Sequence, residues 1–499
     1  MFAKPSSTVR DPYLFAFFGL LILLTLFRLV YITQNEVHPD EAYYWGLGDR
    51  LDWSYYDHPP LTAYAIGLST SFFGKTEFAV RLPAVIFAAA SLLILFFFAL
   101  DIFNSNRTAF LTVFLFSLIP ASNINAIIIT PDAPQFFFWC LTAWLYLRAC
   151  RTDAWIYWLS GGVTLGLGLL SKYTVVFFVP ALFLFLLIFP QQRQKLWGLK
   201  LYSSLFLAFC LFLPVVYWNF VHDFISFKFQ FHHGMDGSKK PAIATFIEFL
   251  GGQAGLISPI FFFLIIDAAF RKQNYEDENL RESLVYLAII FAFSLFFFAF
   301  QSLRSKVEAN WPGYCYATAF LLLGYLVDRR WFAEKCRGLI LTGALLASGM
   351  SAVILVHGVY RFLPLPVKKD VTYKLIGWRK LGEKIQVLQR KHGFKFIIAE
   401  GPTLCSLIRF YTPFTEVFEV NARGHYFKWN RSLPDGGDAL FITTNREKKR
   451  LFSPHFKKPF EEECLKTAYN KAVFRTFYFF IGKSKNGSGR VVKTFPQYY

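Results

Sequence analysis

Residues 12–32 read PYLFAFFGLLILLTLFRLVYI, a run long enough to cross a lipid bilayer as one α-helix. A transmembrane helix needs about 20 apolar residues, because the hydrocarbon core of a bilayer is about 30 Å thick. A signal peptide has an apolar core of only about 7 to 15 residues, so we interpret this run as a retained first span. Similar runs predict about eleven spans, near 12–32, 82–101, 108–126, 133–149, 155–170, 173–190, 200–218, 249–268, 283–300, 312–327 and 338–357.

Composition supports a membrane protein. The 499 residues are 55% hydrophobic and only 17% charged, whereas soluble domains have about 25% charged residues. The formal net charge is +19, but no aromatic-interleaved basic motif or recognition helix is present, so we expect no nucleic-acid partner. The seven cysteines show no metal-binding spacing, and at most Cys405 and Cys464 could form a disulfide.

Basic residues predict the orientation of the spans, because short loops rich in Lys and Arg stay on the cytoplasmic side. With the N-terminus inside, every second loop is basic, from Arg107 to the cluster at 329–337. An odd number of spans then places the C-terminal part outside, in the periplasm or its equivalent. We expect a plasma-membrane protein with many spans.

Two domains are predicted. Residues 1–360 form an α-helical polytopic membrane domain whose large outer loop is 33–81, and residues 361–499 form a small α/β domain. The second begins after prolines that stop the last span. Helical spacing predicts a helix over 373–392, and short runs with turn residues between them predict strands at 394–399, 416–420, 439–443 and 474–481.

Unusual polar residues collect in the loops predicted to lie outside. The loop 33–81 contains NEVHPDEAYYWGLGDRLDWSYYDHPPL (35–61), which is dense in acids and aromatics. The other outer loops contribute a set of ionisable residues: Asp132, Lys172, His222, His232, His233, Lys239, Lys240, Arg304, Lys306 and Glu308.

Acids and cations on one membrane face suit transfer of a sugar from a polyprenyl phosphate. Cations stabilise the phosphate that leaves, and carboxylates deprotonate an acceptor or orient the sugar. Asp40, Glu41 and Asp57 are the candidate acid/base or orienting residues. The candidate phosphate ligands are His58, Lys172, His232, His233, Arg304 and Lys306.

Simpler interpretations remain open for several of these residues. Charges in loops are often only solvated, as for Lys239, Lys240 or His222. Asp132 stands at a helix start, where N-capping explains it as well as catalysis does. Lys172 could extend its ammonium group from a helix end toward water.

The residues also resemble a known family in order along nearly the whole chain. HPDEAYYW (38–45), YYDHPPL (55–61), EFAVRLPAV (77–85), the run from Ile129 to Tyr146, GLGLLSKYTVVFFVPALFL (166–184) and KVEANWPGYCYA (306–317) resemble bacterial members of the dolichyl-phosphate-mannose protein mannosyltransferase superfamily. They look most like the branch of the lipid A aminoarabinose transferases. GWRKLGEKI (377–385), LIRFYTP (407–413) and HYFKWN (425–430) are similar to the soluble domain of that branch.

The resemblance implies a GT-C fold and an inverting transfer that needs neither metal nor cofactor. It places Asp40 and Glu41 on the acidic motif of the family. Arg81 belongs to a second matching motif, EFAVRLPAV. Asp57 and His58 stand where the aminoarabinose transferases have an acid followed by a lysine, and Tyr43 stands where they have an arginine. These departures put aminoarabinose specificity in doubt and leave the general chemistry intact.

We therefore expect a glycosyltransferase that moves one sugar from a polyprenyl-phosphate donor to lipid A, another anionic glycolipid or another envelope acceptor. The alternatives are a protein O-mannosyltransferase-like enzyme and an O-antigen or oligosaccharide transferase. A lipid-sugar transporter is disfavoured, because transport sites need ionisable residues within the spans and the predicted spans are nearly free of them.

Overall fold

The computed structural model describes residues 11–235, 240–271, 277–331, 333–367, 369–419, 437–448, 461–469 and 472–484. It divides the chain into two compact units. The first comprises Met1–Tyr31 and Leu82–Leu355, and the second comprises Ile32–Arg81 and Val356–Tyr499. The outer loop and the C-terminal residues, far apart in the sequence, therefore fold together.

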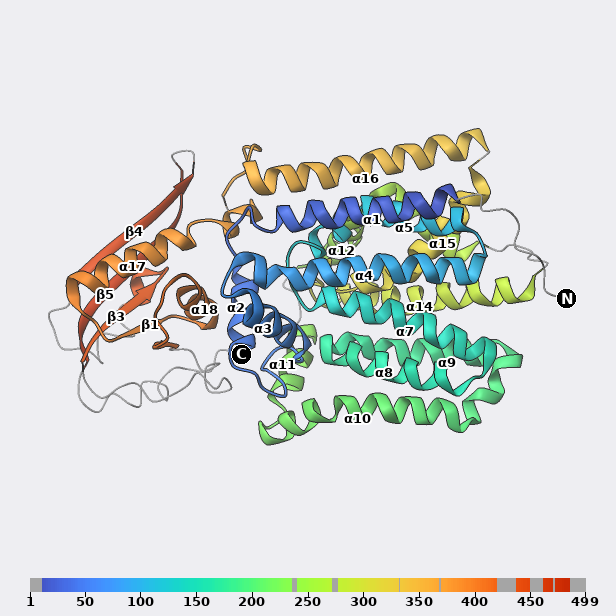
Figure 1. The fold of residues 1–499 in the computed structure, drawn as a ribbon, viewed down its shortest axis with the longest axis horizontal. Helices are drawn as coiled ribbons and strands as arrows, with labels where there is room; N and C mark the ends of the chain where they lie inside the picture. The colour runs from blue at the N-terminus through green and yellow to red at the C-terminus, as the bar shows by residue number, and fades with distance from the viewer. Residues whose placement is uncertain are drawn as a thin grey trace. The chain divides into compact units, whose positions relative to one another are not determined.

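The first unit is a bundle of helices (Figure 1). Each apolar run that predicted a span is helical in the structure, although several spans are interrupted. The elements are α1 (Pro12–Tyr31), α4 (Glu77–Phe103), α5 (Asn106–Leu118), α6 (Pro120–Asn125), α7 (Asp132–Thr152), α8 (Trp155–Ser171), η1 (Tyr173–Phe177), α9 (Phe178–Ile188), η2 (Pro190–Trp197), α10 (Leu199–Val221), α11 (Ile225–Met235), α12 (Ala242–Ile257), α13 (Pro259–Phe270), α14 (Glu278–Ser302), η3 (Gly313–Cys315), α15 (Tyr316–Arg330) and α16 (Glu334–Tyr360). Helices α4 and α16 begin or end in the second unit.

By length and composition, five of the described helices can cross a membrane, or six if α12 and α13 count as one span. The predicted span 249–268 is in fact this pair, which bends by 100°. Ser258 at the bend has a left-handed φ of 83°, and Pro259 starts the next helix. The protein is a multi-pass membrane protein, and the number eleven stays a prediction.

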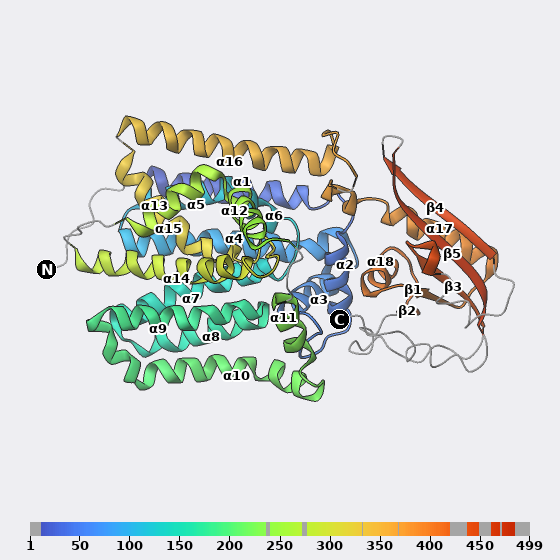
Figure 2. The same cartoon turned by 180° about the vertical axis from the view of Figure 1, so that it is seen from behind.

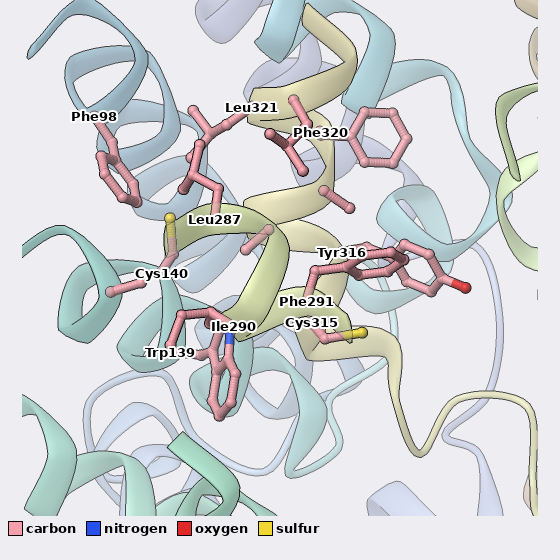
Figure 3. Close-up of a cluster of buried hydrophobic side chains, with 14 of the residues drawn as sticks. Phe98, Trp139, Cys140, Leu287, Ile290, Phe291, Cys315, Tyr316, Phe320 and Leu321 are labelled. Atoms are coloured by element: carbon pink, nitrogen blue, oxygen red, sulfur yellow. The ribbon is translucent and has the colours of Figure 1, made fainter. Parts of the chain in front are cut away.

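Close helix packing in the bundle depends on glycines. A Cβ atom at Gly162 of α8 would lie 2.3 Å from the carbonyl oxygen of Ser204 on α10, so only glycine fits there. Large apolar and aromatic side chains fill the interior. Figure 3 shows part of this core, where Trp139 of α7 lies near Ile290 of α14, and Cys140 of α7 lies near Leu287 of α14.

The second unit combines short helices with one sheet (Figures 1 and 2). Its strands are in the order β2-β1-β3-β5-β4; β1 pairs in parallel with β2 and β3, and β5 pairs antiparallel with β3 and β4. The α/β prediction is confirmed, and the helix α18 and the strand β4 are additional to it. The elements are α2 (Pro39–Gly48), α3 (Leu61–Phe73), η4 (Val371–Leu375), α17 (Trp378–His392), β1 (Phe396–Ala399), α18 (Pro402–Tyr411), β2 (Val417–Glu419), β3 (Gly437–Thr443), η6 (Arg446–Lys448), β4 (Glu461–Tyr469) and β5 (Ala472–Ser484).

The possible disulfide is absent: Cys405 is a buried free thiol and Cys464 an exposed one.

Candidate active site

The acidic pair of the outer loop stands on the first turn of α2. His38 caps this helix: its Nδ1 accepts from the backbone N–H of Asp40 (3.2 Å). Burial lowers the pKa of His38, which keeps the ring neutral and Nδ1 able to accept. Consecutive residues on a helix point in directions about 100° apart. Asp40 and Glu41 therefore face different surroundings.

Glu41 points inward and forms a buried ion pair with Arg81. The side chain of Glu41 is fully buried, and Arg81 Nη2 lies 2.7 Å from Glu41 Oε2. Glu41 also accepts from the backbone N–H of His38 (2.7 Å). The Arg81 guanidinium donates further to the carbonyl oxygens of Ile32, Asn35 and Glu36. The two side chains thus join the segment 32–36, the start of α2 and the start of α4.

Asp40 points outward, and its side chain is 63% exposed. The neutral ring of His38 is close by, with its Nδ1 atom 3.5 Å from Asp40 Oδ2. The exposed carboxylate of Asp40 is accessible to a substrate. The carboxylate of Glu41 is buried and already bonded to Arg81 and to the backbone of His38. The structure therefore separates two adjacent acids that the sequence motif presents together.

A second acid of the loop is held by a tyrosine. The Tyr43 hydroxyl donates to Asp57 Oδ1 (2.8 Å), and the ring of His58 lies 5.8 Å from that of Tyr44. Burial, together with the negative charge of Asp57, raises the pKa of Tyr43. Tyr43 therefore remains a neutral hydrogen-bond donor to Asp57.

The loop is braced by C-terminal residues that the sequence analysis did not single out. Glu36 accepts from the backbone N–H of Trp378 at the start of α17. The Tyr411 hydroxyl accepts from the backbone N–H of Val37 (2.8 Å) and donates to Glu77 (3.1 Å). Further contacts are the ion pairs of Arg379 with Glu77 and of Arg409 with Asp49, and the bonds of Lys75 to the carbonyl oxygens of Arg409 and Thr412.

In the first unit, Asp132 and Lys172 form an ion pair. Lys172 Nζ lies 2.6 Å from Asp132 Oδ1, and the Asn310 amide donates to Asp132 Oδ2 (2.7 Å). Pro131 is the N-cap of α7, and no side chain caps this helix start. Of the two interpretations of Asp132, N-capping is therefore the wrong one. Lys172 is mostly buried, at 12% exposed, and does not simply extend into water.

This ion pair lies at an amphipathic cavity of about 220 Å³. Asp132 and Asn310 line the cavity directly, together with other polar residues. Most of the remaining wall is apolar or aromatic. The polar lining residues are Ser122, Asn125, Thr130, Asp132, Asn310, Tyr314 and Tyr316; the apolar ones include Phe116, Ile119, Phe136 and Leu256.

The other predicted cations lie elsewhere on the surface. Lys306 pairs with Glu308 (2.7 Å), and both are exposed. Arg304 is exposed above the ring of Phe300, and His232 is exposed next to Phe231. His222 stacks on Trp218, and Lys240 pairs with Glu248. The side chain of His233 and all of Lys239 lie outside the described residues.

One group of side chains has the composition of a metal site. Ligand atoms of His392, Glu461 and Glu463 lie within 4.8 Å of one another. However, Lys391 donates to both glutamates, at 2.8 and 3.1 Å, and Lys384 pairs with Glu463. The lysines already balance these carboxylates, so the group works as an ionic contact between α17 and β4.

Comparison with known proteins shows a partial family match and a shared fold. Residues 57–218 match the family model described as dolichyl-phosphate-mannose-protein mannosyltransferase. The fold matches ArnT from Cupriavidus metallidurans, solved with bound undecaprenyl phosphate: the TM-score is 0.62 at 15% sequence identity, over 95% of this chain and 98% of that one. The fold of the chain is therefore of the GT-C type, as the sequence motifs predicted.

Two relatives in sequence are sugar transferases by name. The lipid A galacturonosyltransferase of Rhizobium johnstonii is 24% identical over 443 residues, which are 85% of this chain and 90% of the relative. An undecaprenyl phosphate-alpha-4-amino-4-deoxy-L-arabinose arabinosyl transferase of Pseudomonas fluorescens is 23% identical, over 72% of this chain and 68% of the relative. The resemblance to the lipid A transferase branch is thereby confirmed.

Proposed function

We propose that the protein is an inverting glycosyltransferase that moves one monosaccharide from a polyprenyl-phosphate donor to lipid A or another anionic glycolipid. The observation that carries this proposal is the Asp132–Lys172–Asn310 group at the amphipathic cavity of a membrane helix bundle. A polyprenyl-phosphate sugar needs this combination of polar groups for its sugar phosphate and apolar wall for its chain. The named activities of the two sequence relatives are of the same kind.

In the proposed reaction an acceptor oxygen attacks the anomeric carbon of the sugar. The bond between that carbon and the phosphate oxygen breaks, and its electron pair leaves with the polyprenyl phosphate. Lys172 is the proposed cation for the phosphate. The structure gives no support for His232, Arg304 and Lys306 as further phosphate ligands. Lys306 pairs with Glu308, and the other two are exposed and contact neighbouring aromatic rings.

Asp40 is the proposed general base if the acceptor is a hydroxyl, because its carboxylate is exposed and can take the proton. If the acceptor is an already ionised phosphate, no base is needed, and Asp40 orients the acceptor instead. Asp57, held by Tyr43, is the proposed orienting acid for the sugar. We assign Glu41 and Arg81 the role of holding α2 in place. No metal or cofactor takes part in the proposed reaction.

We further propose that the reaction occurs on the outer face of the inner membrane, with the C-terminal domain in the periplasm. The charge of that domain favours an anionic acceptor. From Leu365 to Tyr499 there are 26 Lys and Arg against 11 Asp and Glu, a net +15 of the +19 of the chain. Basic residues near a membrane attract anionic headgroups by about 1 kcal/mol each.

Mass spectrometry of lipid A and total glycolipids, with and without the gene, tests the proposal. We expect one glycolipid species to be lighter by one monosaccharide when the gene is deleted. An unchanged glycolipid profile would contradict lipid modification, and loss of a longer glycan would favour the oligosaccharide-transferase alternative.

A further inference from the structure

Arg28 is an unusual residue of the bundle. It lies in the last turn of α1 and is only 1% exposed. Its three guanidinium nitrogens are buried and have no hydrogen-bond partner among the residues that the structure describes. A buried charge without a partner is strongly unfavourable in a protein interior, and such residues in membrane spans are usually functional. Arg28 therefore needs an anion that the described residues do not supply.

Two hydrogen bonds show which stretch of α16 the ends of α1 and α5 meet. The Tyr31 hydroxyl donates to the carbonyl oxygen of Leu355 (2.8 Å), and the Ser351 hydroxyl donates to that of Leu118 (2.6 Å). Leu355 and Ser351 are one turn apart on α16, so the ends of α1 and α5 meet the same short stretch of that helix. Arg28 is about one turn before Tyr31, on the part of α1 that approaches this stretch of α16.

The junction of α5 and α6 forms a wall of the amphipathic cavity. Ile119, Ala121 and Ser122 follow directly after Leu118, and all three line the cavity. At the polar end of the cavity, Asp132 is already neutralised by Lys172. The charged groups at the cavity thus cancel, whereas Arg28 of the same bundle carries a buried charge without a partner among the described residues.

We propose that Arg28 is an anion ligand of this cavity and binds the phosphate of a polyprenyl-phosphate donor when the cavity is occupied. The inference rests on the proposed function and adds a residue to it. A guanidinium binds phosphate through two parallel hydrogen bonds. Breaking the bond between sugar and phosphate adds negative charge to the phosphate, which Arg28 stabilises more strongly than it stabilises the donor.

Binding of undecaprenyl phosphate to the purified full-length protein tests this inference without an activity assay. We expect Arg28→Gln and Arg28→Met to weaken binding about ten- to a hundredfold, as for loss of a charge-assisted hydrogen bond. Arg28→Lys should weaken it less. Undecaprenol, which lacks the phosphate, should bind all variants equally weakly, and millimolar inorganic phosphate should not compete.

A matched control is Arg107→Gln, because Arg107 has its own carboxylate partner in Asp328 (3.1 Å) and should leave lipid binding unchanged. A second readout is the thermal unfolding of the ligand-free protein. Arg28→Met removes an unpaired charge, so its unfolding midpoint should equal or exceed that of the wild type.

The outcomes separate this inference from the proposed function. If the wild type binds undecaprenyl phosphate and Arg28→Gln binds it equally well, Arg28 is not a phosphate ligand and the proposed function stands. A lower unfolding midpoint of ligand-free Arg28→Met would also overturn the inference, because it would show a structural role. If inorganic phosphate competes fully, the ligand is a free phosphate and not the lipid. Failure of the wild type to bind any lipid phosphate would contradict both proposals.

Discussion

The substitution Glu41→Gln should destabilise the second unit while leaving its shape unchanged. Glutamine has the size of glutamate, but it leaves the Arg81 guanidinium, 2% exposed, without its counter-charge. Breaking a buried ion pair by removing one partner costs about 3–5 kcal/mol. Arg81 keeps its bonds to the carbonyl oxygens of Ile32, Asn35 and Glu36, so we expect about 3 kcal/mol, the lower end of this range.

Unfolding of the purified full chain in detergent, followed by tryptophan fluorescence against denaturant or temperature, measures this loss. Asp40→Asn is the matched control, because it removes the charge of the adjacent, exposed acid and should change the free energy of unfolding by no more than about 0.5 kcal/mol. Equal stability of Glu41→Gln and the wild type would refute the bracing role of the Glu41–Arg81 pair. Equal destabilisation by both substitutions would refute the separation of the two acids.

Three further predictions concern activity, pH and topology. Asp40→Asn should lower transfer by about 10²- to 10⁴-fold with a hydroxyl acceptor and remove the acid limb of the pH profile; full activity would exclude Asp40 and direct attention to Asp57. The lowered pKa of His38 means that the folded state disfavours the protonated ring. The contribution of His38 to stability is therefore complete above the unfolded pKa of about 6.5, and it decreases as the pH falls below that value. His38→Asn should keep the helix cap and remove this loss, measured by unfolding at pH 5 and pH 8, and an unchanged pH dependence would contradict the role of His38. A reporter fused after Tyr499 should indicate the periplasm and one fused at Gln191 the cytoplasm; finding both in the cytoplasm would place the proposed site on the wrong face.

The sequence predicted the helices of the bundle well, because a bilayer requires long apolar runs and these are easily read. It did not predict where the runs break. Pro120 ends one helix and starts another, and the left-handed Ser258 turns the chain sharply before Pro259. Propensity alone does not reveal such a bend, because a proline at the start of a helix and one inside it look alike in sequence.

The short elements of the second unit were harder to predict. The strand β4 begins EEE, a charged pattern that suits a sheet edge but lacks the alternation of a half-buried strand. The helix α2 has only ten residues. Its start was readable, however, from the proline at the first position and the acids of the first turn.

The candidate site was predicted in part. The motif located Asp40 and Glu41, but adjacency in sequence could not show which acid is exposed, since this depends on Arg81, forty positions later. Arg28 was overlooked because a single arginine hardly changes the hydropathy of a span. Its significance comes from its burial and missing partner, which are properties of the fold.

The most direct test of the proposed function is transfer by the purified protein, with a polyprenyl-phosphate sugar as donor and lipid A as acceptor. Mass spectrometry would follow both products. We predict that the acceptor gains the mass of one monosaccharide and that polyprenyl monophosphate is released in equal amount. Release of polyprenyl monophosphate without any gain by a glycolipid acceptor, or the gain of a longer glycan, would contradict the proposed function.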